Sequence, residues 1–174
     1  MKTVFLSAGH SDTDPGAVAN GRVEADIAVE FRNMVAFYLQ RAGVPHELDG
    51  GGTTNLPLNK AARLAREHDI AVEFHCNAAG DASATGTEVL SAPGDAALAA
   101  RLSAAVAGAL RLRDRGAKAE DSGQHKRLAF VQAGGLIVEL LFITNPGDLA
   151  AYDARKWLAA RAVAQVLLEE AGGA

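Results

Sequence analysis

The chain has 174 residues, 49% of them hydrophobic, so one domain can bury a sizeable core without disulfide bonds. Lys and Arg number 17 against 21 Asp and Glu, and the resulting net charge of −4 excludes the basic surface typical of nucleic-acid binding. No segment approaches the ~18 consecutive apolar residues of a membrane span, and the apolar start is too short for a signal peptide. We therefore expect a monomer that is made in the cytoplasm without a signal peptide and does not insert into membranes.

The first half of the chain alternates strand and helix patterns. Residues 3–8 form a continuous apolar run, which is typical of a strand covered on both faces. Apolar residues at helical spacing follow over 27–38, and Gly43 with Pro45 ends that helix. The remaining segments predict a weaker strand over 44–48, a glycine-rich loop over 50–54 and a second helix over 58–67.

The second half continues the alternation. We expect strands over 69–75 and 87–91, an alanine-rich helix over 95–110, and a polar, mostly irregular segment over 111–127. A short strand over 130–132, a strong strand over 136–141 and a final helix over 154–170 complete the chain. No repeat or linker composition interrupts this order. The sequence therefore predicts a single three-layer α/β/α domain over residues 1–174, with a mostly parallel or mixed central sheet.

Four polar residues interrupt or follow these elements. His10, His75 and Glu139 each lie at the end of a predicted strand, and Glu24 lies in the first turn of the first helix. In open α/β sheets, functional sites form beyond the carboxyl ends of strands, so these residues can converge. A carboxylate inside the apolar run 135–142 is costly to bury unless it has a partner or a functional role. Glu139 is therefore a candidate functional residue.

The residue types point to metal-assisted hydrolysis. Two imidazoles and a carboxylate can hold a catalytic zinc ion with one position open for water, and a second carboxylate can move the protons. The other histidines, His46, His68 and His125, are expected at the surface, although His125 can reach the cleft. Cys76 neighbours His75 on a strand and points to the opposite face, so we expect it to pack rather than to act as a nucleophile.

Several motifs occur in an order that resembles a known family. The segments, in chain order, are 8–10 (AGH), 14–17 (DPGA), 21–24 (GRVE), 74–78 (FHCNA), 86–88 (GTE), 115–116 (RG) and 138–145 (VELLFITN). This order resembles the zinc-dependent N-acetylmuramoyl-L-alanine amidases, the cell-wall hydrolases of bacteria and phage endolysins. Ser11 and Asp12 replace a glycine pair of the family pattern, and Leu141 replaces a glycine, so the cleft shape is where substrate preference can differ.

The resemblance implies a role for each of the four residues. His10, Glu24 and His75 are expected to bind Zn²⁺, Glu139 is expected to be the catalytic carboxylate, and Arg115 is expected to line the cleft. The implied reaction is hydrolysis of the amide between N-acetylmuramic acid and L-alanine in peptidoglycan. The implied protein is a single catalytic domain without a separate wall-binding domain, and the setting we expect is a phage endolysin that causes cytolysis by acting on the cell wall after release.

Two other functions use the same features. A zinc peptidase that cuts within the stem peptide would share the chemistry, but no histidine here begins an H-E-x-x-H motif. A non-catalytic wall-binding module would keep the fold, but it would not need all four polar residues. The products of peptidoglycan digestion separate the amidase from the peptidase, and zinc content separates the enzyme from the module.

Overall fold

A mixed six-stranded sheet forms the centre of the computed structural model, which describes residues 1–11, 13–122 and 127–172. The strand order is β4-β1-β5-β8-β6-β7. β4, β1, β5 and β8 are parallel, β6 runs antiparallel to β8, and β7 is parallel to β6. The strands span Val4–Ala8 (β1), His46–Leu48 (β4), Ile70–Asn77 (β5), Thr87–Ser91 (β6), Asp114–Ala119 (β7) and Leu136–Phe142 (β8).

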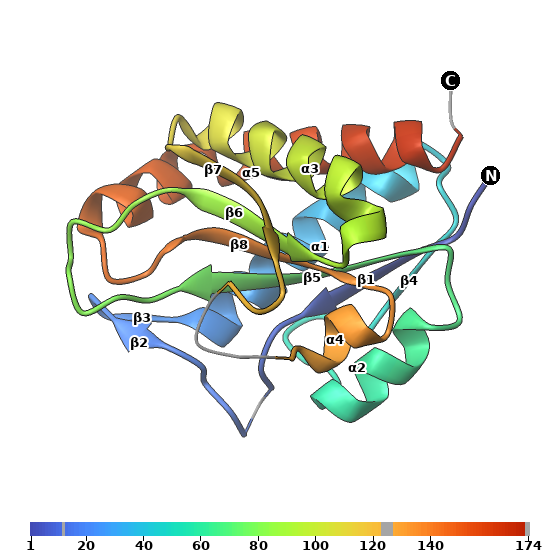
Figure 1. Ribbon diagram of the computed structural model, residues 1–174, viewed down its shortest axis with the longest axis horizontal. Coiled ribbons are helices and arrows are strands. Elements are labelled where there is room, and N and C mark those ends of the chain that lie inside the picture. Colours follow the sequence, from blue (N-terminus) through green and yellow to red (C-terminus); the bar gives the residue numbers. More distant parts are fainter. Residues whose placement is uncertain (12, 123–126, 173–174) are drawn as a thin grey trace.

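Helices cover both faces of this sheet (Figure 1). One layer contains α1 (Glu24–Arg41), α3 (Ala96–Leu110) and α5 (Pro146–Glu170), and the other contains the shorter α2 (Leu58–Ala65) and α4 (Ala129–Gln132). A two-stranded hairpin of β2 (Val18–Ala19) and β3 (Arg22–Val23) precedes α1, and a 3₁₀ turn over Pro93–Asp95 precedes α3. The predicted α/β/α architecture with a mixed sheet is confirmed.

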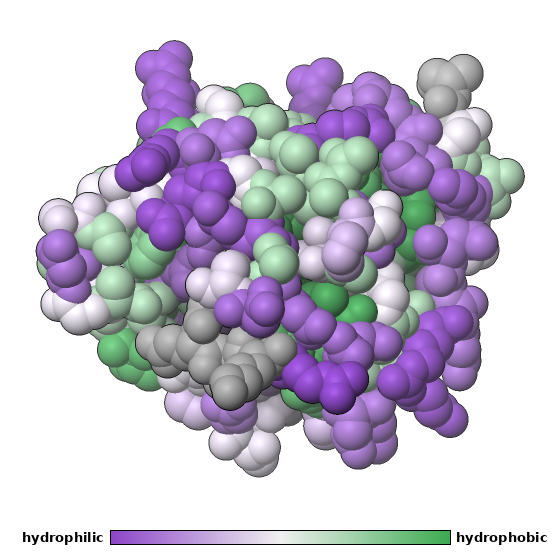
Figure 2. Space-filling view, in the orientation of Figure 1, coloured by the Kyte–Doolittle hydropathy of each residue, from purple (hydrophilic) through white to green (hydrophobic). Residues whose placement is uncertain are grey.

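Alternate residues of β1 enter different cores. Val4 and Leu6 pack in the larger core beneath α1, α3 and α5, whereas Phe5 packs in the smaller core with α2 and α4. Both faces of β1 are therefore buried, which explains its continuous apolar sequence. On the face shown in Figure 2, apolar surface over the alanine-rich α3 lies beside hydrophilic side chains.

Two predicted segments need correction. Residues 111–127, predicted to be mostly irregular, contain the edge strand β7, whose residues are mostly half-buried and therefore tolerate a polar sequence. Residues 130–132, predicted to be a strand, belong to α4. A run this short does not distinguish a strand from a buried helical turn by its pattern, and Phe130 and Val131 are buried in the smaller core in either case.

The last helix begins earlier than predicted. α5 starts at Pro146 rather than near residue 154, because Asn145 caps it by accepting hydrogen bonds from the N–H groups of Gly147 (2.8 Å) and Asp148 (3.2 Å). None of the described helices, α5 included, is long and apolar enough to cross a membrane.

Asp148 in the first turn of α5 joins the helix to the sheet. Its buried carboxylate accepts hydrogen bonds from the N–H groups of Phe142 (3.0 Å), at the end of β8, and Gly86 (3.1 Å), just before β6. It also accepts a hydrogen bond from the Thr85 hydroxyl (2.5 Å). One side chain thus holds together the ends of two neighbouring strands and a helix.

Removing this carboxylate should destabilise the fold. We expect Asp148→Ala to lower the free energy of unfolding by about 2–4 kcal/mol, since two buried backbone N–H groups would lose their acceptor. Asp153→Ala is the control on the same helix: its carboxylate is half-exposed and pairs with Arg22, a surface contact that contributes about 0–1 kcal/mol. Urea denaturation measures both, and equal losses would contradict the role given to Asp148.

Candidate metal centre and active site

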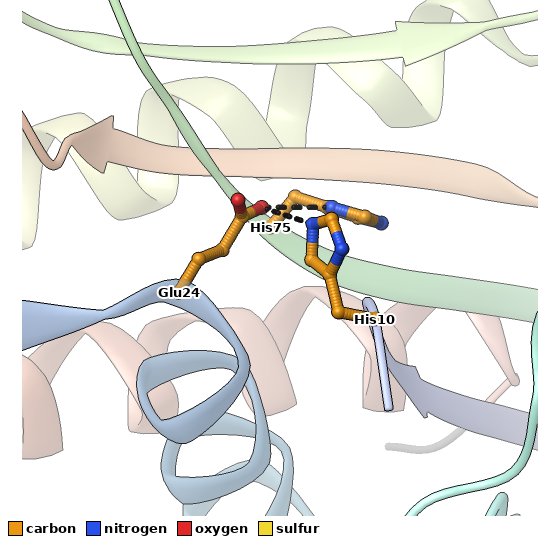
Figure 3. A group of neighbouring side chains, drawn as sticks. All are labelled: His10, Glu24 and His75. Atoms are coloured by element: carbon orange, nitrogen blue, oxygen red, sulfur yellow. Dashed lines mark hydrogen bonds and ion pairs between the residues drawn. The ribbon is translucent and has the colours of Figure 1, made fainter. Parts of the chain in front are cut away.

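Three side chains from separate segments meet beyond the parallel strands (Figure 3). His10 follows β1, Glu24 is the first residue of α1, and His75 lies near the end of β5. One ligand atom from each lies within 4.8 Å of the others. Two nitrogens and one carboxylate oxygen form a donor set of the kind that binds catalytic zinc.

Glu24 occupies the middle of this group. Its Oε1 lies 3.0 Å from His10 Nε2 and 3.0 Å from His75 Nδ1. The backbone N–H of Cys76 donates to the same oxygen (3.0 Å), and that of Ala17 donates to Oε2 (2.9 Å). Burial alone would raise the pKa of Glu24, but its contacts with both imidazoles hold that pKa well below its usual value. Glu24 is therefore a buried anion that faces two nitrogen donors.

The second nitrogen of each imidazole also faces a carboxylate. His10 Nδ1 lies 3.1 Å from Asp14 Oδ2, and His75 Nε2 lies 3.1 Å from Glu73 Oε1. Contacts of this kind fix which ring nitrogen carries the proton. They leave His10 Nε2 and His75 Nδ1 as the nitrogens directed at Glu24. Sequence reasoning missed Glu73, although a carboxylate inside the apolar strand 70–76 carries the same signal that singled out Glu139.

Two glycines make room for the imidazoles. A Cβ on Gly9 would lie 2.2 Å from the His75 ring, and one on Gly16 would lie 2.5 Å from the His10 ring. Gly16 also has a left-handed backbone, with φ at 65°, and His10 itself has φ at 69°. A left-handed conformation is uncommon for a residue with a side chain and is often found at functional sites. The motifs around His10 therefore reflect close packing as well as chemistry.

Glu139 lies in the middle of β8, not at its end as predicted, yet it still faces the group. It is in register with His75 of β5 on one side and with Glu88 of β6 on the other. Within the part of the chain that the structure describes, its Oε2 is buried without a hydrogen-bond partner. Burial, together with the negative charges of Glu24 and Glu88, raises the pKa of Glu139 to about 7. A carboxyl group with this pKa can both accept and return a proton near neutral pH.

A cleft of about 660 Å³ opens over these residues. His10, Glu24, His75 and Glu139 all line it. Its apolar wall comes from the segment before and into α2, from α4 and from the sheet, and includes Leu56, Pro57, Leu58, Leu90, Leu128, Ala129, Phe130 and Ile137. The polar group thus lies at one side of a partly apolar cleft, as in many ligand sites.

The other residues considered in the sequence analysis do not join the four-residue group. Arg115 donates a hydrogen bond to Glu88 (2.6 Å), and it is Glu88 rather than Arg115 that is among the cleft-lining residues. Cys76 is buried, and burial raises the pKa of its thiol well above the usual value, so it is a poor nucleophile. His46 and His68 contact backbone carbonyl groups outside the cleft. His125 lies outside the described residues.

Comparison with known proteins identifies the family. The family model Amidase_3, described as N-acetylmuramoyl-L-alanine amidase, matches residues 4–169. The chain is 32% identical over 154 residues to the uncharacterised Bacillus subtilis protein YqiI, a match that covers 84% of this chain and 73% of YqiI. It is 29% identical over 156 residues to N-acetylmuramoyl-L-alanine amidase LytC of Bacillus subtilis, a match that covers 84% of this chain and 30% of LytC.

Solved structures agree with the family match. A Neisseria meningitidis structure assigned to the N-acetylmuramoyl-L-alanine amidases is 44% identical, with a TM-score of 0.92, and the match covers 99% of this chain and 97% of that one. The catalytic domain of the amidase CwlV from Bacillus (Paenibacillus) polymyxa shares the fold at 22% identity, with a TM-score of 0.85 and 98% of each chain covered. The chain belongs to the Amidase_3 family of N-acetylmuramoyl-L-alanine amidases.

Proposed function

We propose that this protein hydrolyses the amide bond between N-acetylmuramic acid and L-alanine in peptidoglycan, with zinc bound by His10, Glu24 and His75. The observation that carries the proposal is the convergence of these three ligand atoms within 4.8 Å, beside the unpartnered carboxylate oxygen of Glu139. Family membership supports the amidase reaction and the peptidoglycan substrate.

The side chains present fit a zinc ion. Oε1 of the buried Glu24 has a histidine nitrogen 3.0 Å away on each side, and two nitrogens with one carboxylate oxygen are a common catalytic zinc set. When bound, zinc would polarise the scissile carbonyl group and lower the pKa of water at its open position.

Glu139 would carry the protons of the reaction. No group in the described residues donates a hydrogen bond to its Oε2, so this oxygen is available to accept the proton of the attacking water. The L-alanine amine must gain a proton as it leaves, and the same carboxyl group can return it. Burial of Glu139 keeps its pKa near the neutral range, where both steps are possible. One carboxylate would therefore serve first as base and then as acid.

We further propose that residues 1–174 act as one catalytic domain and as a monomer. The six-stranded sheet, with cores on both faces that draw on helices from both halves of the chain, supports a single domain. Action on the cell wall after release, in a phage endolysin, remains our prediction of the setting. Cleavage within the stem peptide would instead indicate a zinc peptidase. Binding to peptidoglycan without turnover would indicate a non-catalytic wall-binding module.

The metal ligands can be tested directly. We expect the purified wild-type protein to contain about one zinc ion per chain and His75→Ala to lose both the zinc and the activity, because only one nitrogen and one carboxylate would remain. Elemental analysis measures the zinc content. His46→Ala is the matched control, since His46 contacts a backbone carbonyl group away from the cleft and should leave the zinc in place. Full zinc occupancy in His75→Ala would show that the ligand assignment is wrong.

A substitution at Glu139 can separate the catalytic step from zinc binding. Glu139→Gln keeps the size of the side chain but loses the proton acceptor, so we expect normal folding and zinc content with turnover lowered by a factor on the order of a hundred or more. Glu47→Gln, on β4, removes an exposed carboxylate away from the cleft and should retain full activity. Near-normal turnover in Glu139→Gln would refute the assigned role.

The products of digestion identify the bond. Mass spectrometry of digested peptidoglycan should find intact stem peptides with a free L-alanine amino terminus and unshortened glycan strands. New reducing ends would indicate a glycosidase, which usually needs two carboxylates that flank the bond. Stem peptides cut internally while still attached to glycan would indicate a peptidase.

A further inference from the structure

Glu73 is a buried carboxylate that the proposed reaction does not use. It precedes His75 by two residues on β5, so both side chains lie on the same face of the sheet. Its side chain is 4% exposed, and its Oε1 lies 3.1 Å from His75 Nε2. An unpaired charge at this depth would be costly, so the contact with His75 is the first indication of a function.

We propose that Glu73 is a positioning residue of the metal centre, which accepts a hydrogen bond from His75 Nε2–H and thereby leaves His75 Nδ1 free to bind the metal. A neutral imidazole carries its proton on one nitrogen only, and the other is the available ligand. His75 Nδ1 is the nitrogen that faces Glu24 Oε1 at 3.0 Å. An acceptor at Nε2 therefore selects the tautomer that the site needs. This inference rests on the proposed zinc site.

A buried hydrogen-bond network holds Glu73 itself in place. Ser7 on β1 is in register with Glu73, and its hydroxyl donates to Glu73 Oε2 (2.9 Å). The same hydroxyl lies 3.0 Å from Asp49 Oδ2. Asp49 already accepts hydrogen bonds from Arg32 (2.5 Å) and from the Ala8 N–H (3.0 Å), so the single Ser7 proton can serve Glu73 without leaving Asp49 unsatisfied.

The helix that carries the carboxylate ligand also supports this contact. Arg32 is fully buried and lies in α1, which begins at Glu24. It donates to Asp49, whose other oxygen lies 3.0 Å from the Ser7 hydroxyl, and that hydroxyl donates to Glu73. With Glu24 at Nδ1 and Glu73 at Nε2, the His75 imidazole faces a carboxylate at each nitrogen, which restricts its rotation.

Asp14 provides a matched comparison. Asp14 contacts the outer nitrogen of His10 in the same way that Glu73 contacts that of His75. The distance from Asp14 Oδ2 to His10 Nδ1 is 3.1 Å. Its side chain is 64% exposed, however, against 4% for Glu73. Water can replace the exposed Asp14 carboxylate as an acceptor more readily than it can replace the buried Glu73 carboxylate. The two carboxylates should therefore differ in their effect on metal affinity.

The experiment measures zinc affinity by competition with a chromophoric chelator in the wild type, Glu73→Ala, Glu73→Gln and Asp14→Ala. We expect Glu73→Ala to weaken zinc binding by about 10–100-fold, the usual effect of removing an outer partner of a metal-bound histidine. Glu73→Gln should lose less, because its carbonyl oxygen still accepts from Nε2–H. Asp14→Ala should change the affinity by less than about threefold, because an exposed ionic contact contributes little. Long-range ¹H–¹⁵N spectra of the zinc-loaded wild type should show His75 protonated at Nε2.

The outcomes separate this inference from the proposed function. If the wild type binds zinc and a folded Glu73→Ala variant binds it equally tightly, Glu73 is not a positioning residue. If Glu73→Ala does not fold, the test passes to the zinc-loaded wild type and Glu73→Gln, in which His75 protonated at Nδ1 would overturn the proposal. If the wild type itself binds no zinc, the zinc site fails, and this inference fails with it.

Discussion

The contact of one buried carboxylate with two imidazoles organises the functional end of this molecule. Glu24 begins α1, and its Oε1 lies between His10 after β1 and His75 on β5. Two backbone N–H groups fix the carboxylate, so it does not depend on the histidines alone for its position. Burial of a carboxylate is unfavourable unless such donors are present. The helix start, the loop after β1 and the end of β5 must therefore fold together for the charge to be accommodated.

Most of the sheet could be predicted because its strands are apolar runs. The converging polar residues could be predicted because they lie within or next to these runs. A continuous hydrophobic strand such as β1 leaves a clear pattern, and a charged residue such as Glu139 inside one has few explanations. The metal roles of His10, Glu24 and His75 remain predictions, but the proximity of these three residues is a property of the fold.

The parts that could not be predicted have physical reasons. The edge strand β7 is only partly buried, so its sequence contains no apolar alternation to detect. The helix α4 has four residues, too few to establish a period. Glu73 interrupts an apolar strand as Glu139 does, but its partner Ser7 is identified only once the register of β1 and β5 is known. Pairwise contacts between strands are set by the tertiary structure and not by local sequence.

The register across β5, β8 and β6 has a consequence for how this cleft can vary. His75, Glu139 and Glu88 form one row across three adjacent strands, each separated from the next by one strand spacing of ~4.8 Å. The separation between the main chains of His75 and Glu139 is therefore set by main-chain hydrogen bonds and not by loop conformation. Insertions or substitutions in the surrounding loops can reshape the cleft while the spacing of these two residues is preserved. The shape of the cleft and the spacing of its polar residues are thus mechanically separate in this architecture.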